Sequence, residues 1–178
     1  MTSLLPKRSA SWSTLCLVGI SAALAGWAAA RLALTFVSIV PGLNWFAGSR
    51  TDVEVFSLAA ALVSLLIGPL FWWLFLIRPH QFTLRRGILV GSCGSLVAHP
   101  LTWLLAMAVG SLSGINTVLG HPLRELVPAM KDPNLIGELL VSFFLSIYSL
   151  ILVGWITALV GGVVGGVLVK GLLVTFSE

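Results

Sequence analysis

Charged residues are scarce in this chain. Only 9% of its 178 residues are Asp, Glu, Lys or Arg, whereas 58% are hydrophobic. Average soluble domains carry roughly 25% charged residues, so this chain has too few polar side chains to cover a soluble globule. The shortage excludes an ordinary soluble domain, a disordered segment and a nucleic-acid-binding module. A mean hydropathy of +1.06 then indicates an integral membrane protein.

Cysteines and acidic residues are also few, and this limits the possible chemistry. The two cysteines, Cys16 and Cys93, lie within apolar runs, so we interpret both as small buried hydrophobic residues rather than a disulfide framework. The sequence has no His-Glu-x-x-His motif, no phosphate-binding glycine loop and no acid at the centre of a long apolar run. No pair of His, Cys or carboxylates has metal-ligand spacing on one helix face. We therefore expect neither an enzyme nor a metal site.

Long apolar stretches predict an all-α membrane protein, a bundle of four transmembrane helices. A spanning helix needs about 20 apolar residues, and the first run is too long for the core of a signal peptide. Arg31 interrupts this run, but no turn residue lies beside it, so one helix continues through it. Thr51 and Glu54 fit a capping box at the start of the second helix. The predicted spans cover about 13–40, 53–77, 87–111 and 137–170 of a single membrane domain, residues 1–178.

Basic residues flank the predicted spans unevenly, and this predicts the orientation. The side that holds both termini and the middle loop has six of them, Lys7, Arg8, Arg78, Arg85, Arg86 and Lys170. The other side has three, Arg50, Arg124 and Lys131. The positive-inside rule then predicts that both termini are cytoplasmic. We expect a multi-pass protein of a bacterial inner (cytoplasmic) membrane, in which the net charge of +4 reflects orientation and not binding of nucleic acid.

The loop between the third and fourth spans contains a second kind of apolar pattern. Four residues recur at i, i+3, i+4 and i+7, namely Leu123, Leu126, Val127 and Met130. This spacing predicts a short amphipathic helix on the extracytoplasmic side. We expect it to lie flat on the membrane surface, and a plug or a docking ridge for a partner is the alternative.

Small residues recur every four positions in the last two spans. The fourth span has Gly154, Ala158, Gly162 and Gly166 in one row, with Gly161 and Gly165 beside it, and the third has Gly87, Gly91 and Ser95. Residues four apart share a helix face, and small side chains there let two backbones approach closely in a membrane. These faces pack either inside the bundle, which is the simpler expectation, or against another subunit or a second copy.

Three ionisable residues in the spans are candidates for function. Arg31 lies in the first span, His99 lies near the middle of the third, and Glu138 lies near the start of the fourth. Arg31 either snorkels or pairs with an acid on the outer side, for which Glu138 is best placed. His99 is either the axial ligand of a haem or chlorin or, more simply, a neutral imidazole bonded to a Ser or a carbonyl near Pro100. We predict no cofactor from this residue alone.

So little polar chemistry favours a function that depends on contacts within the membrane. Our first hypothesis is a non-enzymatic integral membrane subunit, regulator or assembly factor that packs against other membrane components through its small-residue faces. One alternative is a small oligomeric transporter or channel with Arg31, Glu138 and His99 along its path. A second is a haem- or pigment-binding membrane subunit that uses His99. The expected partners are membrane lipid and other membrane subunits or a second copy.

Overall fold

The computed structural model describes residues 12–40, 50–113 and 135–175, and four long helices dominate these ranges. In chain order they are α1 (Trp12–Ile39), α2 (Arg50–Trp72) with its π-helical continuation η2 (Trp73–Ile77), α3 (Leu84–Ser113) and α5 (Leu135–Thr175). All four are long and apolar enough to cross a membrane, which confirms the predicted all-helical architecture with four spanning helices. The chain is therefore described below as an integral membrane protein.

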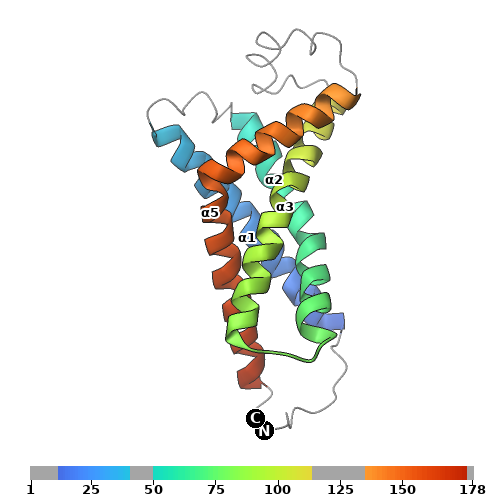
Figure 1. Ribbon diagram of the computed structural model, residues 1–178, viewed down its shortest axis with the longest axis vertical. Helices are drawn as coiled ribbons and strands as arrows, with labels where there is room; N and C mark the ends of the chain where they lie inside the picture. The colour runs from blue at the N-terminus through green and yellow to red at the C-terminus, as the bar shows by residue number, and fades with distance from the viewer. Residues whose placement is uncertain (1–11, 41–49, 114–134, 176–178) are drawn as a thin grey trace.

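The helices alternate in direction along the bundle (Figure 1). The start of α1 and the end of α5 lie at one end, called the lower end from its place in Figure 1, and the α2–α3 connection lies there too. Helix α1 packs against α2, α2 against α3, and α3 against α5, while a smaller α1–α5 contact closes the ring. The α3–α5 contact is the most extensive of these.

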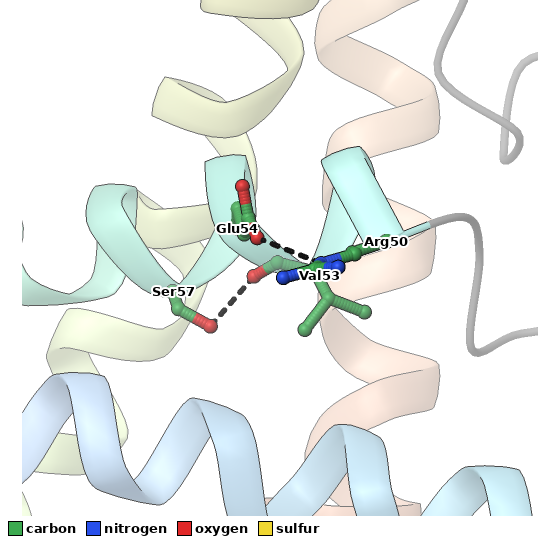
Figure 2. Close-up of polar contacts among 4 residues, drawn as sticks. All are labelled: Arg50, Val53, Glu54 and Ser57. Atoms are coloured by element: carbon green, nitrogen blue, oxygen red, sulfur yellow. Dashed lines mark hydrogen bonds and ion pairs between the residues drawn. The ribbon is translucent and has the colours of Figure 1, made fainter.

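The start of α2 differs from the prediction at Thr51. The helix already includes Arg50, so Thr51 is a helical residue and not the cap. Arg50 Nε lies 3.3 Å from Glu54 Oε1 one turn later, and Ser57 Oγ donates to the Val53 carbonyl at 2.6 Å (Figure 2). The ion pair is exposed, so it supports the extra turn by only about 0.2–0.5 kcal/mol.

The end of α2 widens into a π-helical turn. Arg78 N donates to the Trp73 carbonyl at 2.9 Å, five residues back, and Pro69 inside the helix has no N–H to donate to the preceding turn. Such turns insert one extra residue and shift the faces that follow. Here Leu76 and Trp72 face inward, whereas Trp73 is 44% exposed.

The interior of the bundle is made largely of small residues, and its outer surface is made of large ones. Side chains such as Leu24, Leu66, Ile151 and Trp155 are exposed, whereas Ala29, Ala30, Ala59 and Ala98 are buried. This is the reverse of a water-soluble bundle, and it suits a bilayer because lipid solvates large apolar side chains as well as a protein core does. Two clusters of buried hydrophobic residues lie toward the ends of the bundle: Ala33, Val37, Trp103, Leu145 and Val153 above, and Val18, Trp72, Leu76, Ile77 and Val169 below.

Two predictions about single segments have different outcomes. Cys16 and Cys93 are exposed and not buried, which corrects the prediction, because a small thiol is tolerated on a lipid-facing surface as readily as in an apolar core. The amphipathic helix predicted over 123–130 lies outside the residues that the structure describes.

Candidate functional site

The small-residue faces of α3 and α5 lie against each other in the lower half of the bundle. A Cβ added to Gly91 would overlap the carbonyl oxygen of Gly161, and one added to Gly87 would lie 2.7 Å from that of Gly165. A Cβ added to Gly165 would in turn overlap the Gly87 carbonyl oxygen. Backbones this close leave no space for a side chain, so glycine is required at each crossing. These faces pack within the chain.

The second row of small residues on α5 extends this contact. Gly162 lies beside Ser92 and Ile88, and Gly166 lies beside Ile88. Ser92 Oγ donates to the Ala158 carbonyl at 2.9 Å, a hydrogen bond between the two helices. Gly154 is the exception, because the nearest atoms to an added Cβ belong to Leu150 in its own helix.

A second close contact, between α1 and α2, was missed by the sequence analysis. A Cβ on Gly26 would lie 2.8 Å from the Ala60 carbonyl oxygen, and one on Gly68 would overlap Ala22. The signal was present, because small residues recur every three or four positions in this helix at Gly19, Ala22, Gly26, Ala29, Ala30 and Ala33. Alanine contributes to this pattern as much as glycine. The α1–α2 contact was not predicted because the prediction used mainly rows of glycine.

His99 is buried in the bundle and hydrogen-bonded to α5. Its Nε2 lies 2.6 Å from Ser149 Oγ, and Trp103 Nε1 donates to the same hydroxyl at 2.7 Å. Ser149 Oγ donates to the Ser146 carbonyl at 3.1 Å. A hydroxyl has one proton and two lone pairs, so a neutral His99 that carries its proton on Nε2 satisfies all three contacts at once. A haem or chlorin could use Nε2 only by breaking the bond to Ser149.

Arg31 lies half-buried in the upper half of α1. Its Nε is buried and has no hydrogen-bond partner among the described residues. Its guanidinium carbon lies 5.3 Å from the ring centroid of Trp27, one turn below, an arrangement that favours a cation–π interaction. Trp27 is itself exposed on the outer surface, so this pair marks a polar position on the lipid-facing side of α1.

The contact between α1 and α5 lies well below the start of α5. The two helices meet where the Phe36 and Trp155 rings stack edge to face, 5.9 Å between centroids. Glu138 precedes Trp155 by about 25 Å along α5, and α5 starts across the bundle from the end of α1 (Figure 1). The side chain of Glu138 itself lies outside the described residues.

Arg31 and His99 do not share a site. His99 lines a central cavity, whereas Arg31 does not. Among the side chains that the structure describes, no group of three His, Cys, Asp or Glu is placed to hold a metal ion.

The chain was also compared with known proteins. No family model matches it, and neither the curated proteins nor the solved structures give a match. Functional inference therefore depends on the chain's own geometry.

Gly91→Ala should destabilise the bundle, because the added methyl group would overlap the Gly161 carbonyl. We expect a loss of about 1–3 kcal/mol in the free energy of unfolding, measured by thermal unfolding in detergent. Gly171→Ala is the matched control, since an added Cβ there meets nothing within 4 Å. In that open position alanine should be neutral or stabilising, and equal effects of the two variants would contradict the internal packing.

Ser149→Ala should also destabilise the fold, because it leaves the buried Trp103 N–H and His99 ring nitrogen without their shared partner. The expected cost is about 1–3 kcal/mol, and Ser149→Thr should recover part of it. Ser38→Ala serves as the control, since the exposed Ser38 hydroxyl donates only to the Thr35 carbonyl in its own helix. The shift of the Trp103 indole N–H signal in an NMR spectrum reports the hydrogen bond directly, and an unchanged signal would argue against the cluster.

Proposed function

We propose that this protein is a non-enzymatic subunit or assembly factor that binds another membrane protein through Arg31 on α1. The observation that carries the proposal is the position of Arg31 within a spanning helix, half-buried and beside the exposed Trp27. A cation within a membrane is costly, and such residues usually pair with another group or line a functional path. A carboxylate or a carbonyl-bearing side chain on a partner helix would pair with the guanidinium.

The location of Arg31 supports an intermolecular role. It lies beside the exposed Trp27, on the side of α1 that lipid or a partner reaches. The small-residue faces first considered for this role are used between α3 and α5. A partner that recognises α1 through the half-buried Arg31 leaves those internal contacts intact.

The transporter and pigment-binding alternatives have less support in the geometry. A path along the bundle axis would contain His99 but not Arg31, since only His99 lines the cavity. The His99 Nε2 that would bind a metal porphyrin is within hydrogen-bond distance of Ser149. No described contact favours either function over the subunit role.

The proposed orientation follows from the uneven basic residues, with the lower end and both termini in the cytoplasm of a bacterial cell. Arg78, Arg85, Arg86 and Lys170 are all exposed at that end. Arg31 then lies in the outer half of the membrane, about 12 Å below the upper end of α1.

Arg31→Gln should release the partner. The tagged protein is purified in mild detergent and examined by native mass spectrometry. We expect the wild type to carry a second membrane protein, and the Arg31→Gln variant to retain about one-tenth as much of that partner or less. Arg31→Lys keeps the positive charge but loses the planar set of guanidinium N–H donors, so this variant should retain part of the complex. Arg50→Gln, which removes only an exposed ion pair, is the control. A wild-type protein that is monodisperse and unpartnered would refute the proposal.

Reporter fusions test the orientation. Green fluorescent protein fused after Glu178 should fluoresce in a bacterial host, and alkaline phosphatase at the same position should stay inactive, because both report a cytoplasmic C-terminus. Replacing Arg78, Arg85 and Arg86 with Gln should mix the orientations, since it removes half of the basic residues on that side. Strong phosphatase activity of the wild-type fusion would reverse the proposed orientation.

A further inference from the structure

One flank of the α3–α5 contact ends at a lysine. Gly162 and Gly166 of α5 lie on this flank, because a Cβ added to either would have Ile88 of α3 within 3.4 Å. Lys170 is the next residue of the same row, one helical turn below Gly166. Its side chain is exposed, so its ammonium group lies on this flank at the lower end of the bundle.

Arg85 occupies the corresponding position on α3. It follows Leu84, which lies beside Gly166 of α5, and it precedes Ile88 by three residues, so it shares their side of the helix. The Arg85 side chain is also exposed. One basic residue from each helix therefore flanks the same contact.

The two basic residues are at nearly the same height in the bundle. A Cβ added to Gly87 would lie 2.6 Å from Val169 Cγ2. Lys170 directly follows Val169, and Arg85 precedes Gly87 by two residues, about 3 Å along α3. Because the two backbones are in contact here, a group placed between the two long side chains is within reach of both.

Acidic residues are distant from this pair of cations. Those in the described ranges, Asp52, Glu54 and Glu138, lie in the first turns of α2 and α5, at the upper end of the bundle (Figure 1). Two like charges on neighbouring helices repel each other, and an anion between them would replace this repulsion by two attractions. Arg85 and Lys170 therefore favour an anionic ligand.

The surface above the two cations is apolar. Ile88 of α3 is 43% exposed, and Leu159, which precedes Gly162 by three residues on α5, is 61% exposed. Gly162 and Gly166 lie between them and add no side chains to this surface. A ligand that matches the whole flank has an anionic group at the lower end and hydrocarbon above it.

We propose that Arg85 and Lys170 bind the phosphate of one anionic phospholipid, whose acyl chains lie along the flank of α3 and α5 above them. The Arg85 guanidinium can donate two parallel hydrogen bonds to phosphate oxygens, and the Lys170 ammonium adds a compact charge. Phospholipid surrounds the helices of a membrane protein, so this ligand reaches the site without a channel. The proposal is independent of the partner proposed for Arg31, which lies in the upper half of α1.

The chain contains a matched control beside Arg85. Arg86 is equally exposed, but it is turned about 100° further around α3, away from the flank that contacts α5. Arg78 is a second control, because it is exposed at the same end of the bundle but follows η2, on another helix. Loss of either arginine lowers the charge of the lower end as much as loss of Arg85 does.

Titration of the full-length protein with lipid in mild detergent, followed by native mass spectrometry, tests the proposal. The probe is phosphatidylglycerol. Phosphatidylcholine with the same acyl chains has no net charge, and glycerol 3-phosphate has the phosphate without the chains. We expect one phosphatidylglycerol per chain, with a Kd at least about tenfold below that of phosphatidylcholine. Equal binding of the two lipids, or displacement of phosphatidylglycerol by an equal concentration of glycerol 3-phosphate, would overturn the proposal.

Single variants separate a defined site from general attraction to a basic surface. Arg85→Gln and Lys170→Gln should each raise the Kd for phosphatidylglycerol about fivefold. Arg86→Gln and Arg78→Gln should change it less than about twofold, because neither side chain lies on the flank. All four residues are exposed, so the variants should unfold at the wild-type temperature when no lipid is added. Equal effects of the four substitutions on the Kd would show that only the net charge matters and would refute the site.

Discussion

The direct contact between the backbones of α3 and α5 is the constraint on which the rest of the bundle depends. In a bilayer no hydrophobic driving force brings two apolar helices together, so their association relies on close packing and on hydrogen bonds between them. Gly87, Gly91, Gly161 and Gly165 let the two backbones meet, and the bond from Ser92 to the Ala158 carbonyl adds a directional contact. Once α3 and α5 are paired in this register, His99 is placed opposite Ser149.

The same use of small residues explains the cavity. Alanines and glycines bring α1 and α2 together at Gly26 and Gly68, but small side chains cannot fill the space at the centre of a four-helix ring. The backbones are in close contact within the helix pairs, whereas a cavity remains along the axis of the bundle. Three polar side chains of the α3–α5 contact, Ser92, His99 and Ser149, are hydrogen-bonded within the protein.

The sequence predicted the four helices well because charge is so scarce that each gap between charges is the length of a span. It also predicted which residues on α3 and α5 are small enough for close packing. It could not assign their partners, because a glycine row is compatible with any second helix, and only the three-dimensional register pairs Gly91 with Gly161. Ser149 was missed for a related reason. A serine in an apolar run is common, and its role is defined by the residues that it contacts on the neighbouring helix.

The most direct test of this account asks whether the α3–α5 contact forms within one chain. An added Cβ at Gly162 lies 2.6 Å from Ser92 Oγ, which is close enough for the pair Ser92→Cys and Gly162→Cys to form a disulfide. The natural thiols, Cys16 and Cys93, are exposed and would first be replaced by serine. Under mild oxidation in the membrane, the account predicts a monomer in which the two new thiols are joined to each other. Disulfide-linked dimers, or a monomer with both thiols still free, would contradict it.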